Sequence, residues 1–261
     1  MYYYLYDSFL NDKKYEKVLA RIESRLTDLG INGKIGRLNI LKNPNELVED
    51  EIKSGAKTVV VVGNDKTVIQ ILNALAGNKA VLGFIPLGSD NKLSEVLGIP
   101  YGEEACDLLS ARRVKKIDLG KANNQYFLSN LQIKSNKVEL EFEKGYKVIP
   151  VKNNEITIYN LAGPEIMSQS KFIKPQDGLL ETLVEPQKVN LPKFLNILSK
   201  PKKFKEVGKR SIFPTKKLTI KSLDSEPVSV LLDGIKVLKT PVKVEVALKK
   251  LTVIVGKDRM F

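Results

Sequence analysis

The sequence contains no histidine and no tryptophan, and its only cysteine is Cys106. The absence of histidine excludes Ser-His-Asp and Cys-His catalysis, a histidine general base and histidine-bound zinc. One cysteine cannot form an intrachain disulfide, which suits a reducing compartment. Any general acid or base must therefore be an Asp, Glu, Lys, Tyr or Cys side chain.

The sequence also lacks a long apolar run. No run approaches the ~18 residues that cross a bilayer, and residues 1–14 contain no basic segment followed by an apolar one, as a secretory signal would. We therefore expect a cytoplasmic protein. Acidic residues are outnumbered: 43 Lys and Arg against 30 Asp and Glu give a net charge of +13. This surplus favours an anionic partner, such as a nucleotide, a nucleic acid or an acidic membrane.

Residues 1–118 alternate between segments typical of strands and of helices. Lys13 to Leu29 carries apolar residues at helical spacing, and Thr58 to Val62 is a β-branched run typical of a strand buried on both faces. The same alternation continues with strands at 37–41 and 80–85 and helices at 43–53, 66–76, 92–97 and 103–110. We therefore predict a Rossmann-like, doubly wound α/β domain.

The pattern changes after residue 118, where long helical periods disappear. Short β-rich runs follow at 126–133, 138–142, 146–151, 155–161, 218–220, 228–232, 242–247 and 251–255. Residues 191–198 alone still have a helical pattern. We predict an antiparallel sandwich or barrel over residues 119–261, which makes a second domain.

Two strand-to-helix turns in the first half are candidates for binding phosphate. The first is Gly-Asn-Asp-Lys-Thr at residues 63–67, and the second is Pro-Leu-Gly-Ser-Asp-Asn at residues 86–91. Ligands of doubly wound sheets collect at the carboxyl ends of strands, and backbone N–H groups at a helix start can bind phosphate oxygens. Spacing alone does not distinguish such a site from two ordinary turns that contain glycine.

The residues themselves resemble the diacylglycerol kinase catalytic domain family, which includes sphingosine kinases and bacterial lipid kinases. The first turn is similar to the family's Gly-Gly-Asp-Gly-Thr motif. The second turn, with Leu-Gly-Ile-Pro at residues 97–100, is similar to its Pro-Leu-Gly-Thr-x-Asn-Asp segment and the Leu-Gly-Ile-Pro after it. Further matches follow in family order at residues 117–120 with 126–127, 177–181, and 232–234 with 241–242. Five ordered matches predict that this chain shares the fold.

The resemblance implies an α/β nucleotide domain, a β-sandwich domain and an active site in the cleft between them. It also implies transfer of the γ-phosphate of ATP, with Mg²⁺, to a lipid hydroxyl such as that of diacylglycerol. The residues that it assigns to the nucleotide are Gly63, Asn64, Asp65, Lys66, Thr67, Gly88, Ser89 and Asn91. Asp233 would accept the proton of the attacking hydroxyl, and Asp177 with Glu181 would support a magnesium-linked carboxylate network.

Several motif positions depart from the family. Asn64 and Lys66 replace glycines, Lys92 replaces an Asp, and Ile235 replaces the Glu of Asp-Gly-Glu beside Asp233. The family's Asn-Pro-x-Ser-Gly segment near the N-terminus is absent. A left-handed Lys at position 66 would cost about 1–2 kcal/mol. Its side chain would either block the phosphate site or bind phosphate.

These departures leave three functions open. The first is a working lipid kinase with a rewired site. The second is a catalytically impaired member that binds nucleotide or anionic lipid without phosphotransfer. The third is a kinase with a small soluble acceptor, because the related NAD kinases share this type of loop.

The segment Lys200 to Lys221 holds nine basic residues and one acid, Glu206. It is either a surface that docks on anionic lipid, which would make the protein peripheral at a membrane, or a solvated face. Nucleic acid is disfavoured, because only Phe204 and Phe213 interleave with these charges. The sequence leaves the oligomeric state open.

Overall fold

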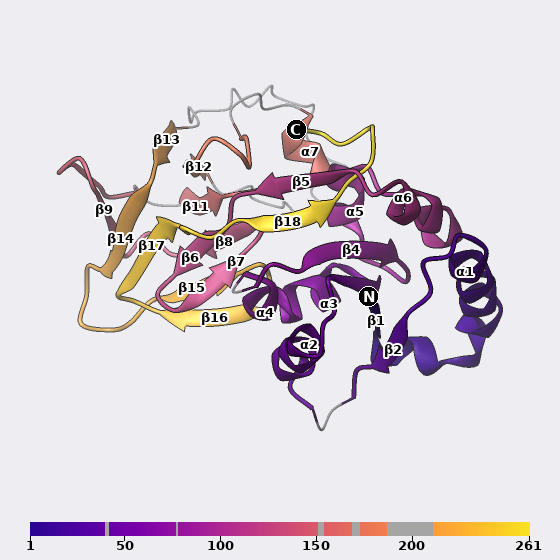
Figure 1. Ribbon diagram of the computed structural model, residues 1–261. Coiled ribbons are helices and arrows are strands. Elements are labelled where there is room, and N and C mark those ends of the chain that lie inside the picture. The colour runs from indigo at the N-terminus through magenta and orange to yellow at the C-terminus, as the bar shows by residue number, and fades with distance from the viewer. Residues whose placement is uncertain (40–41, 77, 151–153, 169–172, 187–210) are drawn as a thin grey trace, which may run out of the picture.

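The computed structural model describes residues 1–39, 42–76, 78–150, 154–168, 173–186 and 211–261. Within them, the strands form three six-stranded sheets, of which one is mostly parallel and two are antiparallel. Figure 1 shows the mostly parallel sheet with its helices on one side of the molecule and the antiparallel sheets on the other. The predicted combination of a doubly wound α/β unit and an antiparallel β-sandwich is confirmed.

The first sheet has the strand order β2-β1-β3-β4-β18-β5. Its first four strands are parallel and comprise Tyr2–Tyr6 (β1), Lys34–Arg37 (β2), Thr58–Gly63 (β3) and Val81–Pro86 (β4). Every residue of β3 is buried, as expected for a β-branched strand covered on both faces. The register pairs Gly63 with Pro86, so β3 and β4 end side by side.

Helices cover this sheet. α1 packs with α6, and α2 packs with α4 on the opposite side (Figure 1). The helices are Glu16–Asp28 (α1), Pro44–Lys53 (α2), Asp65–Gln70 (α3), Leu72–Ala76 (α4), Lys92–Leu97 (α5) and Ala105–Ala111 (α6), with 3-10 turns at Ser8–Asn11 (η1), Lys13–Tyr15 (η2) and Gly102–Glu104 (η3). The predicted helix at 66–76 is divided at Ile71, whose N–H bonds to the Val68 carbonyl three residues earlier (3.3 Å).

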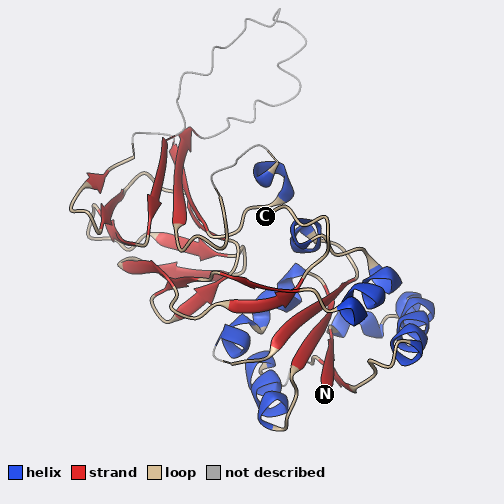
Figure 2. Cartoon of the chain, turned by 45° about the horizontal axis from the view of Figure 1, so that its top comes forward, coloured by secondary structure: helices blue, strands red, loops and turns tan. Residues whose placement is uncertain are grey.

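The other two sheets pack face to face as a sandwich (Figure 2). Their strand orders are β10-β9-β14-β17-β6-β7 and β13-β12-β11-β8-β15-β16. Inward-facing apolar residues of both sheets, such as Leu140, Ile158 and Val244, form one buried cluster. The strands are Gly120–Ala122 (β6), Gln125–Phe127 (β7), Asn130–Ile133 (β8), Val138–Phe142 (β9), Lys147–Val148 (β10), Asn154–Tyr159 (β11), Leu180–Pro186 (β12), Ser211–Thr215 (β13), Lys217–Ser222 (β14), Ser229–Leu232 (β15), Lys236–Lys239 (β16) and Val242–Val246 (β17). One short helix, Pro164–Met167 (α7), follows β11.

The last strand corrects the expected organisation. The pattern predicts residues 251–255 in the antiparallel half, but β18 (Leu251–Ile254) lies in the first sheet. It is parallel to β4 and antiparallel to β5 (Val114–Ile117). A short apolar run identifies a strand but not the sheet that it joins. The chain therefore returns to the α/β half at its end, and the domain boundary after residue 118 stays a prediction.

Other differences from the predicted elements are local. The pattern predicts a strand at 37–41, whereas β2 is Lys34–Arg37. β2 is mostly exposed, so no buried apolar pattern marks its position. The predicted helix at 191–198 and the basic residues 200–210 lie outside the described residues. Among the described helices, none is both long enough and apolar enough to cross a membrane.

Candidate functional site

The two predicted phosphate loops lie together at one edge of the first sheet. The first loop follows β3 and the second follows β4. The Leu87 N–H donates to the Gly63 carbonyl (2.6 Å), and the Asp65 N–H donates to the Asp90 carbonyl (3.1 Å). The loops therefore form one hydrogen-bonded unit at the carboxyl ends of parallel strands, where ligands of such sheets bind.

The first loop satisfies its own backbone donors. Asn64 is the N-cap of α3, and its Oδ1 accepts the N–H groups of Lys66 (3.1 Å) and Thr67 (3.4 Å). The Asn64 N–H is directed to Thr67 Oγ1 (3.3 Å), which completes a capping box. Thr67 Oγ1 in turn donates to Asp7 Oδ2 (2.5 Å). Together with the Asp65 bond to the second loop, the N–H groups of residues 64 to 67 all have partners within the protein.

The two glycine replacements do not strain this loop. Asn64 has extended backbone (φ −122°, ψ −176°), and Lys66 lies in the first turn of α3 rather than in the left-handed region. The strain considered for a left-handed Lys at position 66 is therefore absent. Gly63 has a steric role instead, because a Cβ there would lie 2.7 Å from Thr67 Oγ1.

The second loop depends on two residues with positive φ, Gly88 (78°) and Asp90 (62°). The Gly88 N–H donates to the hydroxyl of Tyr101 (3.0 Å). Asn91 Nδ2 donates to the Gly88 carbonyl (3.0 Å). Asn91 thus closes the loop from within, while its buried Oδ1 has no hydrogen-bond partner among the described residues.

Asp65 connects the first loop to α5. Its Oδ2 accepts the N–H of Leu93 (3.0 Å), whereas its buried Oδ1 has no hydrogen-bond partner in the described part of the chain. Burial raises the pKa of Asp65 to about 6, against the opposing effect of the N–H donors of Leu93 and Lys92. An unpartnered carboxylate oxygen can bind a cation or accept a proton.

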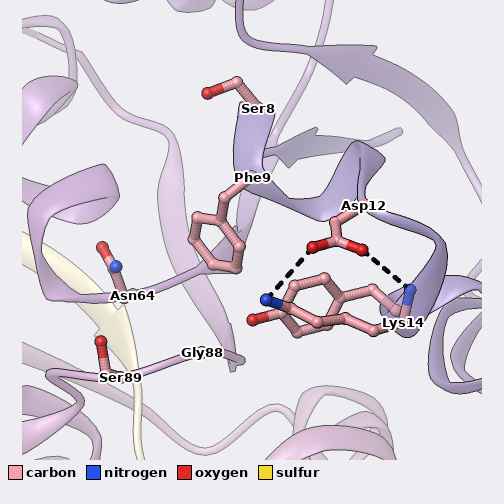
Figure 3. Close-up of a pocket in the computed structure, with 8 residues that line it drawn as sticks. Ser8, Phe9, Asp12, Lys14, Asn64, Gly88 and Ser89 are labelled. Carbon is pink, nitrogen blue, oxygen red and sulfur yellow. Dashed lines mark hydrogen bonds and ion pairs between the residues drawn. The ribbon is translucent and has the colours of Figure 1, made fainter.

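A pocket of about 440 Å³ opens on one side of the two loops (Figure 3). The Phe9 ring lies against Gly88, where a Cβ would be 2.9 Å from the ring, and meets the ring of Tyr15 edge to face at 5.4 Å between centroids. The pocket therefore has an aromatic wall beside polar loop residues. It is lined by Ser8, Phe9, Asp12, Lys14, Tyr15, Asn64, Gly88 and Ser89.

A separate cleft of about 360 Å³ opens on the other side of the loops, between the first sheet and the sandwich. Its polar lining combines both halves of the chain: Asp65, Lys66, Asp90 and Lys92 from the first, and Ser129, Asn130, Gln132, Tyr159, Glu165 and Asp233 from the second. Residues 64 and 89 line the pocket, and their neighbours 65 and 90 line the cleft. The two loops are therefore the wall between the two cavities.

Asp233 reaches this cleft from the turn between β15 and β16. Asp233 and Gly234 both have positive φ (46° and 70°), a conformation typical of Asp-Gly in tight hairpins. The Asp233 carboxylate accepts three backbone N–H groups, from Leu128 at Oδ2 (2.8 Å) and from Ser129 (2.8 Å) and Asn130 (2.9 Å) at Oδ1. Burial raises its pKa to about 6, although these three donors oppose the rise.

The structure does not bring Asp177 and Glu181 to the cleft. Asp177 lines another cavity, near the C-terminus, and its Oδ1 accepts the Leu179 N–H (3.0 Å). Glu181 is buried on β12, and burial, together with the charge of Asp177, raises its pKa to about 8. No cluster of three or more His, Cys, Asp and Glu side chains within the described ranges is arranged to hold a metal ion. The magnesium-linked network at this pair stays a prediction.

Sequence reasoning missed three residues that shape the loops. Asp7 binds Thr67, Phe9 packs on Gly88, and Tyr101 binds the Gly88 N–H. Asp7 and Phe9 stand where the family's N-terminal segment is absent, so no motif marked them. Tyr101 directly follows the matched Leu-Gly-Ile-Pro segment, but a spacing rule does not show that its hydroxyl turns back to the loop.

Comparison with known proteins agrees with this geometry. Residues 3–122 match the model of the diacylglycerol kinase catalytic domain, which covers β1 to β6 and both loops. These residues belong to the diacylglycerol kinase catalytic domain family. The resemblance noted in the sequence is therefore confirmed, and the two loops lie within the matched domain.

Relatives of this diacylglycerol kinase family domain differ in how much of the chain they match. A diacylglycerol kinase of Bacillus subtilis is 23% identical over 67% of this chain and 70% of its own length. A Pseudomonas aeruginosa protein named probable lipid kinase YegS-like is 34% identical over 32% of this chain and 28% of its own. A crystal structure of a Bacillus anthracis diacylglycerol kinase covers 98% of this chain and 97% of its own, with a TM-score of 0.75 and 22% identity. The fold is therefore shared along nearly the whole chain.

Proposed function

We propose that the chain is an ATP-dependent lipid kinase that transfers a phosphoryl group to the hydroxyl of diacylglycerol or a similar lipid. The observation that carries this proposal is the position of the two loops between a nucleoside-sized pocket and a cleft with carboxylates from both halves of the chain. Membership of the diacylglycerol kinase family supports the same reaction.

In this proposal the nucleotide lies over the two loops and extends from the pocket into the cleft. Its base and ribose occupy the pocket beside Phe9, and its phosphates extend past Asn64 and Ser89 into the cleft. Gly88 allows this approach, because any side chain there would meet the Phe9 ring. Thr67 is buried behind Asn64 and holds the loop in shape instead of contacting the nucleotide.

The cleft residues then carry the chemistry. The lipid hydroxyl attacks the γ-phosphorus, the bond to the β-phosphate oxygen breaks, and ADP leaves. Asp233 Oδ2 accepts only one backbone N–H, so it retains a lone pair for the hydroxyl proton. A pKa near 6 leaves this carboxylate ionised at neutral pH, as a general base must be.

The residues at the cleft also fit a magnesium ion carried by the nucleotide. Mg²⁺ in such sites uses one or two carboxylates together with substrate phosphates and water, so it needs no protein cage. The unpartnered Oδ1 of Asp65 offers one hard oxygen at the loop that the phosphates cross. When bound, the ion would neutralise phosphate charge.

The test is phosphatidic acid formation from ATP and diacylglycerol in mixed micelles. We expect turnover by the wild type, and a loss of at least about a hundredfold in kcat for Asp233→Asn and for Asp65→Asn. Circular dichroism would show that both variants remain folded.

Turnover is expected to rise as pH increases through about 6, since the base must lose its proton. Nucleotide binding without turnover would contradict the proposal and indicate an impaired member. Turnover of NAD but not lipid would indicate a soluble acceptor.

A further inference from the structure

The backbone donors of the first loop that could hold phosphate are already engaged, as is one donor of the second loop. In the first loop, Asn64 Oδ1 binds the N–H groups of residues 66 and 67, and Asp65 donates to the second loop. In the second loop, the Gly88 N–H is bound to Tyr101. A phosphate at the first loop would therefore have to displace existing hydrogen bonds, or be held by side chains.

Two side chains offer the required charge. Among the described residues that line the cleft, the cations are Lys66 and Lys92. Lys66 belongs to the first loop and lies in the first turn of α3, and Lys92 directly follows the second loop as the first residue of α5. The same cleft contains the carboxyl groups of Asp65, Asp90, Glu165 and Asp233, so a polyphosphate could enter only with positive charge to offset them.

Both ammonium groups are available to an anion. Lys66 is exposed and forms no ion pair with any described residue. Lys92 Nζ lies 3.6 Å from Glu165 Oε1, but both side chains are mostly exposed, and exposed pairs of this kind are weak. A phosphate can therefore replace Glu165 as the partner of Lys92 at little cost.

We propose that Lys66 and Lys92 hold the phosphate chain of the donor nucleotide through their ammonium groups, in place of the backbone amides of the first loop. This inference rests on the proposed function, in which a nucleotide crosses the loops. It assigns a binding role to two residues that replace a glycine and an aspartate of the family motifs. It also makes phosphate binding dependent on side-chain charge, and therefore on salt.

The experiment is titration calorimetry of the full chain with ATP and, separately, with inorganic tripolyphosphate, each at low and high salt. We expect Lys66→Gln and Lys92→Gln each to lower the affinity for ATP and for tripolyphosphate about tenfold, as the loss of a charged hydrogen bond would. Lys66→Arg retains the charge and should bind within about threefold of the wild type. The affinity of each Gln variant should also depend less on salt.

Two matched variants separate this effect from general charge and from loss of the ion pair. Lys57→Gln removes a cation just before β3, at the opposite end of that strand, and should bind as the wild type does. Glu165→Gln breaks the pair with Lys92 but keeps the ammonium, so binding should be unchanged or tighter. Urea unfolding should show equal stability for all of these variants.

The outcomes distinguish this inference from the proposed function. If the wild type binds ATP and both Gln variants bind it equally well, the inference is overturned, the remaining amides of the second loop hold the phosphates, and the kinase proposal stands. If the Gln variants bind tripolyphosphate more weakly than the wild type does, but the wild type phosphorylates no acceptor, the phosphate site at Lys66 and Lys92 stands and the kinase proposal fails. If the wild type binds neither probe, the inference is overturned.

Discussion

Asn64 determines the shape of the first loop. Its side-chain oxygen takes two N–H groups of α3, and its own N–H completes the capping box with Thr67. A family glycine at this position would leave the Lys66 N–H without this acceptor, while the Thr67 N–H would keep the carbonyl of residue 64. One residue therefore caps the start of α3 and engages the Lys66 amide, which is why we propose that side chains bind the phosphates.

The contribution of this cap can be measured. We expect Asn64→Ala to lower the free energy of unfolding by about 1 kcal/mol, because the Lys66 N–H loses its acceptor and the Thr67 N–H retains only the Asn64 carbonyl (3.1 Å). Asn64→Gly should cost only a few tenths of a kcal/mol, since water can reach the freed donors. Equilibrium urea unfolding measures both. Equal stability of the wild type and the Ala variant would show that the cap is not formed in solution.

Glu181 predicts a pH dependence of stability. Its side chain is buried on β12, and its pKa is raised to about 8 by burial and by Asp177. Between about pH 5 and pH 8 the folded chain holds this proton and the unfolded chain has lost it. Stability should therefore be full below about pH 5 and fall as pH rises toward 8, by at most about 1.4 kcal/mol per pH unit.

The comparison with Glu181→Gln isolates this contribution. The Gln variant should lack the part of the decline that Glu181 causes, so its free energy of unfolding relative to the wild type should increase from pH 5 to pH 8. Asp177→Asn removes a charge that raises the pKa of Glu181, and should end the decline at a lower pH. Parallel pH profiles for the wild type and Glu181→Gln would show that the carboxyl group is not protonated in the folded protein.

At the scale of elements, the segment that follows β18 contacts the C-terminal end of α5 through backbone atoms. The Gly256 N–H donates to the Leu97 carbonyl (2.9 Å), and a Cβ on Gly256 would lie 1.7 Å from the Gly98 carbonyl oxygen. We expect Gly256→Ala to lower the free energy of unfolding by about 2–3 kcal/mol, because backbone has to move. Gly163→Ala is the control, since its Cβ would meet nothing closer than 3.9 Å. Equal urea midpoints for the two variants would contradict this contact.

Elements with strong local signals could be predicted, whereas their partners could not. β3 is a β-branched run, and α2 begins with Asn43 and Pro44, so local chemistry marks both. The exposed edge strand β2 has no apolar pattern, so the sequence predicts it at residues 37–41 instead of Lys34–Arg37. At the site, the motifs located both loops, but the contact of Asp7 with Thr67 joins residues 60 positions apart. Such contacts follow from the fold and not from spacing.

At the scale of the whole molecule, the first sheet is completed by the end of the chain. β18 lies between β4 and β5, and β5 has no other partner strand among those described. The larger buried cluster also includes Tyr159, Leu161 and Leu183 from the second half. Residues 1–118 alone would therefore lack one strand of the first sheet and part of its core. Their alternating strand and helix pattern does not reveal this dependence on the rest of the chain.

This organisation predicts the behaviour of a fragment. Residues 1–118 alone should not fold cooperatively, because β5 would lose its pairing and β4 would expose one edge. Joining residues 249–261 to residue 118 through a flexible linker should restore part of the cooperativity, because β18 could then enter between β4 and β5. Thermal unfolding followed by circular dichroism compares the two fragments with the full chain, for which we expect one transition. A cooperative transition in residues 1–118 alone would show that the α/β half is an independent domain and that β18 only adds to it.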